Sequence, residues 1–132
     1  MKEFSPSEAI ILLLDSDSIS RAVLREALEH ANYLVVTAGN VARAVDRLQD
    51  TQVDLLITRP YINSMPGAFA AQYLRTRRPG LPVLIVAGFP DDDRVRDPLD
   101  VAQYFTFPKP FGRDDFVAKV KEVIAKIREK QE

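Results

Sequence analysis

Charged side chains that could bind ions follow two apolar segments of this sequence. Asp15 and Asp17 come directly after the apolar run Ala9–Leu14, and Arg59 comes directly after the segment 53–58. Short apolar runs bounded by polar or proline-containing loops are typical of buried parallel strands. In open α/β sheets, ligands bind outside the carboxyl ends of such strands. Carboxylates there bind hard cations, and a guanidinium forms paired hydrogen bonds with a carboxylate.

Residue counts exclude several other kinds of site. The sequence has no cysteine and a single histidine, His30, so it forms no disulfide, thiol nucleophile or multi-histidine metal centre. His30 is expected in the last turn of a helix, at the surface, where the helix dipole favours a cation. No glycine-rich phosphate-binding motif is present. We therefore expect a protein with no enzymatic activity, no cofactor and no bound metal.

Length and charge narrow the class of protein. With 132 residues, 46% of them apolar, the chain suits one domain with a single core. Its net charge is −1 and its lysines and arginines are scattered, so the sequence shows no basic cluster that would bind nucleic acid or an anionic membrane. No apolar run spans a bilayer, and the N-terminus lacks the apolar core of a signal peptide. We expect a cytoplasmic protein with a polar lead-in at 1–8 and a domain at 9–130.

Strand and helix patterns alternate along the chain. The expected strands cover residues 9–14, 33–37, 53–58, 81–86 and 104–107. The expected helices are one capped by Ser16 or Ser18, one capped by Asn40, and the segments 67–77, 98–101 and 113–130. Five successive βα units predict a parallel sheet with helices on both faces. One buried face of the first helix is expected to hold Ile19, Val23, Leu24, Ala27, Leu28 and Ala31.

Two loops carry a resemblance to a known family. A Met-Pro-Gly loop ends at Gly67, eight residues after Arg59, and a Lys-Pro-Phe turn begins at Lys109. With the five βα units, these motifs make residues 10–127 resemble response regulator receiver domains, the CheY-like superfamily. The resemblance implies a three-layer α/β/α sandwich. Its sheet would be flavodoxin-like and doubly wound, with five parallel strands in the order 2-1-3-4-5.

The resemblance also implies roles for five positions. In receiver domains, two acids after the first strand hold Mg²⁺ together with a phospho-acceptor aspartate, while a hydroxyl and a lysine grip the phosphoryl group. Asp15 and Lys109 match the first acid and the lysine. Ser16 stands at the second acid, Arg59 at the phospho-acceptor and Ala87 at the hydroxyl. Three of the five positions are therefore changed.

The charges in this expected pocket balance without a metal ion. Asp17 adds a carboxylate one residue out of register, or it only caps the following helix. With Asp15 and Asp17 facing Arg59 and Lys109, the pocket holds two charges of each sign. Arg59 is predicted to pair with Asp15, the alternative being an exposed loop side chain. The resemblance further implies a cis peptide bond after Lys109.

These changes favour a pseudo-receiver, a two-component (phosphorelay) signalling module that binds partners without aspartyl phosphorylation. One alternative is phosphorylation at an unconventional residue such as Ser64, in the loop after the third strand. Another is a small-ligand-binding module on the same fold. Receivers commonly signal through the fourth helix, fifth strand and fifth helix. Here Thr106 stands at the position of the strand-five aromatic and Ala87 lacks a hydroxyl, so this face is expected to be constitutive.

The expected partners of this face are a histidine kinase, an effector domain or a second copy of the chain. Candidate contact residues are Asp97, Asp100, Gln103, Lys119 and Lys126. An ordinary solvated surface is the alternative for these residues.

Overall fold

The computed structural model describes residues 9–87, 102–106 and 112–130. Its strands are β1 (Ile10–Leu14), β2 (Leu34–Ala38), β3 (Leu55–Thr58), β4 (Tyr61–Ile62), β5 (Met65–Pro66), β6 (Val83–Ala87) and β7 (Ala102–Thr106). Its helices are α1 (Ser18–His30), α2 (Val41–Asp50), α3 (Gly67–Arg77) and α4 (Arg113–Lys130). In the described part of the chain, none of these helices is both long and apolar enough to cross a membrane.

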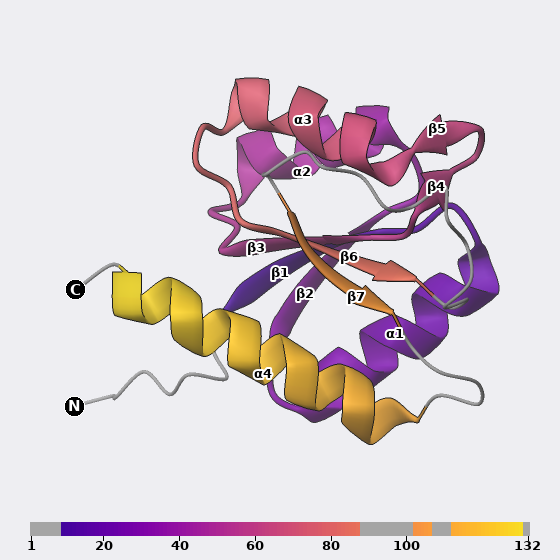
Figure 1. Cartoon of the computed structure of the whole chain (residues 1–132). Helices are drawn as coiled ribbons and strands as arrows, with labels where there is room; N and C mark the ends of the chain where they lie inside the picture. The colour runs from indigo at the N-terminus through magenta and orange to yellow at the C-terminus, as the bar shows by residue number, and fades with distance from the viewer. Residues whose placement is uncertain (1–8, 88–101, 107–111, 131–132) are drawn as a thin grey trace.

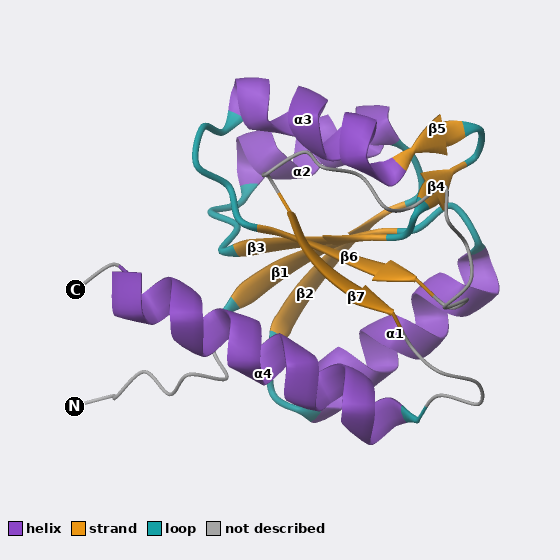
Figure 2. Cartoon of the chain, in the orientation of Figure 1, coloured by secondary structure: helices purple, strands orange, loops and turns teal. Residues whose placement is uncertain are grey.

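Five parallel strands form the sheet in the order β2-β1-β3-β6-β7. Counted along the chain without the small β4–β5 pair, this is the predicted order 2-1-3-4-5. Helices α2 and α3 cover one face of the sheet, and α1 and α4 cover the other (Figures 1 and 2). The predicted fold class, a three-layer α/β/α sandwich, is confirmed.

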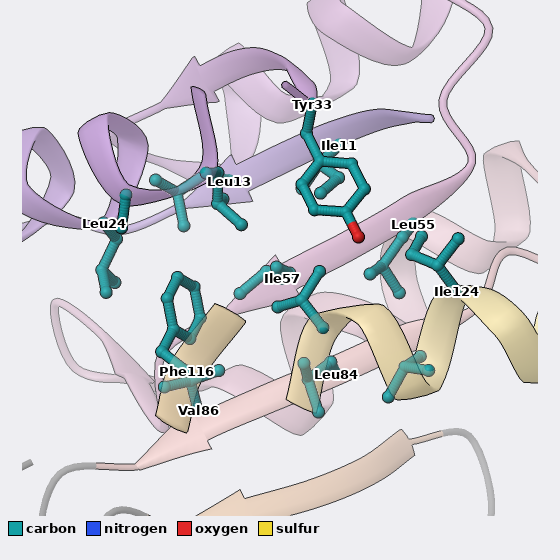
Figure 3. Packing of buried hydrophobic residues seen from close by; sticks show 14 of the residues in the cluster. Ile11, Leu13, Leu24, Tyr33, Leu55, Ile57, Leu84, Val86, Phe116 and Ile124 are labelled. Atoms are coloured by element: carbon teal, nitrogen blue, oxygen red, sulfur yellow. The ribbon is translucent and has the colours of Figure 1, made fainter. Parts of the chain in front are cut away.

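The central strands are apolar except for Thr58 at the end of β3, because helices cover both of their faces. In β1, Ile11 and Leu13 belong to the cluster beneath α1 and α4, while Leu12 and Leu14 belong to the cluster beneath α2 and α3. Figure 3 shows the first cluster, in which Tyr33 inserts its ring among aliphatic side chains from the sheet and α4. This alternation fixes the register of β1, since a shift by one residue would exchange the two faces.

The predicted buried face of α1 is only partly correct. Leu24, Ala27 and Leu28 are buried, but Ile19 is 75% exposed and Val23 is 56% exposed. At roughly 100° per residue, Val23 lies about 90° from the centre of the buried stripe and Ile19 farther still. The two side chains therefore point away from the sheet, and apolar composition alone misplaced them.

Two other segments also differ from the prediction. The loop after β3 contains a two-stranded antiparallel hairpin, β4–β5, in which Asn63 adopts a positive φ of 57°. Asparagine tolerates this left-handed conformation better than most residues, which suits a tight turn. The last strand begins at Ala102, earlier than expected, so Gln103 lies within β7 instead of beside a preceding helix. The expected helix at 98–101 lies outside the described residues.

Candidate functional site at the carboxyl edge of the sheet

Strands β1 and β3 bring Asp15 and Arg59 to the same edge of the sheet. Leu14, the last residue of β1, pairs with Thr58, the last residue of β3. The ladder continues one step further, because the Arg59 backbone N–H donates to the Leu14 carbonyl over 3.3 Å. Asp15 and Arg59 are thus the first residues beyond two neighbouring strands, at the edge where parallel sheets bind ligands.

The Asp15 carboxylate is held by its own loop and helix. Asp15 is 2% exposed. Its Oδ1 accepts a hydrogen bond of 3.0 Å from the Asp17 backbone N–H, and its Oδ2 accepts one of 2.6 Å from the Ser20 hydroxyl. The Arg21 guanidinium donates to the Asp15 backbone carbonyl over 2.7 Å. A buried carboxylate needs such donors, since an unsatisfied one is costly.

Asp17 and Ser16 have separate structural roles. Asp17 is the N-cap of α1, and its side chain accepts a 3.0 Å hydrogen bond from the Ile19 N–H. The prediction that Ser16 or Ser18 caps this helix is therefore wrong. Asp17 caps it, as the alternative for this residue stated. Ser16 Oγ accepts a 3.1 Å hydrogen bond from the Asn63 N–H, which ties the β1–α1 loop to the β4–β5 hairpin.

Arg59 is half-buried near the carboxylates of Asp15 and Asp17. Burial lowers the pKa of its guanidinium, and the nearby carboxylates of Asp15 and Asp17 oppose that shift. Among the residues that the structure describes, the ion pairs within 4.0 Å lie on α1 and α4, and none includes Arg59. The predicted direct pair with Asp15 is thus absent from the described contacts. The Asp15 oxygens accept hydrogen bonds from the Asp17 N–H and the Ser20 hydroxyl, and Asp15 acts on Arg59 by its charge over a longer distance.

Gly67 allows the chain to return tightly over Arg59. A Cβ placed on Gly67 would lie 2.1 Å from the Arg59 carbonyl oxygen, a distance that no side chain can occupy. The Gly67 N–H donates to the Pro60 carbonyl over 2.6 Å and closes the loop that contains the hairpin. The sequence signal for this loop was the Met-Pro-Gly motif, whereas the hairpin itself had no apolar alternation long enough to predict it.

The other predicted pocket positions lie partly outside the described residues. Ala87 ends β6 and pairs with Thr106, the last residue of β7, so both positions reach the same edge of the sheet as Thr58. Lys109 and the peptide bond that follows it lie outside the described residues. Within the described ranges, no group of three or more histidine or acidic residues is placed to hold a metal ion. Asp15 and Asp17 are the carboxylates described near Arg59.

The predicted partner face is described only at three of its residues. Gln103 is placed by its backbone in β7, and Asp97 and Asp100 lie outside the described residues. Lys119 and Lys126 both lie on α4, where each contacts Glu122, at 3.5 Å and 3.4 Å. The hydrogen bond from Lys126, with the charge of Lys119, lowers the pKa of Glu122. Their spacings of three and four residues are those of ordinary pairs on a helix surface.

Comparison with known proteins decides the family. The family model described as "Response regulator receiver domain" matches residues 11–121. The chain belongs to the response regulator receiver family. Among curated relatives of this receiver, CpdR from Brucella abortus is 32% identical over 120 residues, covering 86% of this chain and 95% of CpdR. The transcriptional regulator NtrC from Escherichia coli K12 is 30% identical over 123 residues, covering 93% of this chain. The receiver spans about a quarter of the length of NtrC, since the matched region is 26% of that protein.

Solved structures agree with the fold of this receiver. The receiver domain of an HD domain-containing protein from Pseudomonas fluorescens Pf-5 superposes with a TM-score of 0.78 at 18% identity, covering 92% of this chain and 98% of that one. A CheY-like receiver from Methanospirillum hungatei JF-1 gives a TM-score of 0.77 at 21% identity, covering 93% and 98%. At these identities the likeness concerns the fold alone, and the chemistry depends on the residues at the carboxyl edge.

Proposed function

We propose that this receiver domain is a pseudo-receiver, a cytoplasmic protein-interaction module that works without aspartyl phosphorylation. The observation that carries the proposal is Arg59, which leaves β3 at the position where the family resemblance places the phospho-acceptor. No catalytic activity or cofactor is part of the proposal. The expected partners are a histidine kinase or an effector domain of a two-component pathway.

A guanidinium cannot take the role of an acceptor aspartate. Arginine presents five N–H donors and no oxygen, so it offers no nucleophile to a phosphoryl group. Burial lowers the pKa of Arg59, but Asp15 and Asp17 act in the opposite direction and favour the charged form. An arginine side chain starts from a pKa far above neutrality, so Arg59 remains a cation under physiological conditions.

The groups around Arg59 also disfavour the binding of Mg²⁺. Mg²⁺ prefers an octahedral shell of oxygen ligands. Asp15 is only 2% exposed, and each of its carboxylate oxygens accepts a hydrogen bond. The Asp17 side chain accepts a hydrogen bond at the N-terminus of α1, and Ser16 Oγ accepts one from the Asn63 N–H of the hairpin. The Arg59 charge opposes a second cation in the same place.

The changed positions on β6 and β7 support a face that does not respond to phosphate. Ala87 has no hydroxyl to contact a phosphoryl group, and Thr106 pairs with it in the sheet. A ligand shifts a population only if it binds two states differently. We therefore expect the face formed by β7 and α4, with Gln103, Lys119 and Lys126, to bind its partner equally with and without a phosphodonor.

Phosphorylation assays on matched variants test the proposal. Wild-type protein is incubated with Mg²⁺ and a small phosphodonor and analysed by phosphate-affinity electrophoresis. We expect no phosphorylated band from wild type or from Arg59→Asp, because Ser16 and Ala87 remain unchanged. We expect one from the triple variant Ser16→Asp/Arg59→Asp/Ala87→Thr, which serves as the positive control.

The chemical stability of any phosphate adduct on the wild-type protein shows which kind of residue was phosphorylated. An acyl phosphate that hydroxylamine cleaves would overturn the proposal, because it shows a working carboxylate acceptor. An adduct that resists hydroxylamine would indicate a phosphoester on a hydroxyl group. Ser64 is the candidate for that outcome, because it lies exposed in the turn between β4 and β5.

A further inference from the structure

Large apolar side chains are exposed on α3 and on β5, the short strand that precedes it. Met65 is 41% exposed, Phe69 is 56% exposed and Tyr73 is 45% exposed. Residues four apart are neighbours on a helix surface, so Phe69, Tyr73 and Arg77 form one ridge on α3, here named the α3 ridge, and Met65 lies in β5 just before the helix. A contiguous exposed apolar patch marks an interaction surface, whereas single exposed apolar side chains do not.

The end of the α3 ridge is held in a fixed arrangement. The Arg77 Nη2 donates a hydrogen bond of 2.8 Å to the Tyr73 hydroxyl. The Arg77 guanidinium carbon also lies 5.3 Å from the centroid of the Tyr73 ring. Because the two side chains already hold each other, less conformational entropy is lost when they bind a partner. Tyrosine and arginine are also enriched at protein interfaces.

The two ends of the α3 ridge differ in charge. Helix α3 contains no acidic residue, and its last turn carries Arg75 and Arg77. The opposite end lies at the β4–β5 hairpin, whose Asn63 N–H binds Ser16 in the loop that also carries the exposed carboxylate of Asp17. Half-buried Arg59 offsets part of that negative charge, so the gradient is modest. One end is basic and the other is not.

We propose that the α3 ridge binds the same ridge of a second copy, antiparallel, across a two-fold axis. Antiparallel pairing centred near residue 71 sets Phe69 against Tyr73 of the partner subunit. Ridges of residues four apart interdigitate in the commonest class of helix packing. A two-fold interface uses one patch on both copies, as this spacing allows.

The charges favour this occupant and this orientation. In the antiparallel arrangement, the arginines at the end of each α3 approach the hairpin end of the other copy, near Asp17. A parallel arrangement would bring the two arginine-rich ends together without an acid in α3 to balance them. The ridge is small compared with a standard interface, so the dimer is weak and depends on concentration. This surface lies on the opposite side of the sheet from α4 and is independent of the proposed loss of phosphorylation.

Cross-linking through engineered cysteines tests the arrangement directly. The native chain has no cysteine, so each variant carries one reactive thiol. Gln72→Cys places the thiol on an exposed position of α3 near the proposed axis, and Ala22→Cys places one on exposed α1 as the matched control. A short bis-maleimide should link Gln72→Cys into a covalent dimer and leave Ala22→Cys monomeric. Equal cross-linking of the two variants would contradict the proposal.

Sedimentation equilibrium measures the association of the unmodified protein. We expect an average mass that rises above 14.9 kDa with concentration in wild type. Phe69→Gln and Tyr73→Gln should weaken association by about tenfold or more, as loss of a central aromatic does. Val23→Gln, a change of an equally exposed side chain on α1, should leave association unchanged. A wild-type protein that stays monomeric would overturn the proposal and leave the ridge to a different protein. A dimer insensitive to Phe69→Gln would place the interface elsewhere.

Discussion

Gly67 lies so close to Arg59 that a Cβ on Gly67 would be 2.1 Å from the Arg59 carbonyl oxygen. The contact is with backbone, which cannot move aside as a side chain can. The loop from β3 to α3 therefore requires glycine at this position. It also fixes the backbone of the residue that stands at the expected phospho-acceptor position.

We expect Gly67→Ala to lower the free energy of unfolding by about 2 kcal/mol or more, as overpacking a tight site does. Urea unfolding followed by circular dichroism measures the loss. Gly112→Ala is the matched control, because nothing lies within 4 Å of a Cβ at Gly112. Equal stability of the two variants would show that the loop relaxes without cost.

Replacing the N-cap of α1 should also destabilise the protein. Asp17 caps the helix through a 3.0 Å hydrogen bond from the Ile19 N–H, and loss of such a cap costs about 1 kcal/mol. Asp17→Ala should show this loss in urea unfolding, while Asp17→Ser should keep most of the stability. Asp46→Ala, at an exposed position of α2, is the control. If Asp17→Ala unfolds like wild type, the cap contributes nothing to folding.

Tyr33 should make the protein less stable in alkali. Burial raises the pKa of Tyr33 above its usual value of 10.0. A raised pKa in the folded state means that the contribution is complete below the unfolded pKa and is lost as pH rises through the folded one. The window therefore begins near pH 10 and extends upward. Tyr33→Phe should show a flatter loss of stability between pH 9 and about pH 11 than wild type. Parallel pH profiles in urea unfolding would contradict this role.

The fold was largely predictable because its signals are local and repeated. Apolar runs the length of a strand, each followed by a helical pattern, gave β1, β3 and β6 and the helices between them. Helical spacing correctly predicted the burial of Leu24 and Leu28, but it wrongly predicted burial for Ile19 and Val23. Their exposure depends on which part of the α1 circumference faces the sheet, and that angle is set by packing.

The candidate site was less predictable because it depends on contacts between distant segments. Sequence position suggested that Asp15 and Arg59 meet at one edge, and the β1–β3 register places them there. It did not show that Ser20 takes one Asp15 oxygen, or that Asn63 reaches Ser16 across the hairpin. These hydrogen bonds depend on loop conformation, which a strand pattern does not specify.

Removing the Arg59 charge should change metal binding and stability in opposite directions. Arg59→Ala leaves Asp15 and Asp17 without the nearby cation, so Mg²⁺ affinity should rise. It also removes the packing of a half-buried side chain, so the free energy of unfolding should fall. Titration calorimetry and urea unfolding measure the two effects. Arg43→Ala, an exposed change on α2, is the control. Ordinary receiver affinity for Mg²⁺ in the wild-type protein would contradict the proposed pocket.

The most direct measurement is NMR titration of isotope-labelled protein with beryllofluoride and Mg²⁺, which together mimic an aspartyl phosphate. Because Arg59 offers no carboxylate to bind beryllium and Ala87 no hydroxyl, we expect the amide signals of β6, β7 and α4 to stay unchanged. The triple variant Ser16→Asp/Arg59→Asp/Ala87→Thr should respond and thereby validate the reagent. Shifts in the wild-type protein that spread from Arg59 and Ala87 into residues 102–106 would show a working phosphorylation switch and contradict the assignment as a pseudo-receiver.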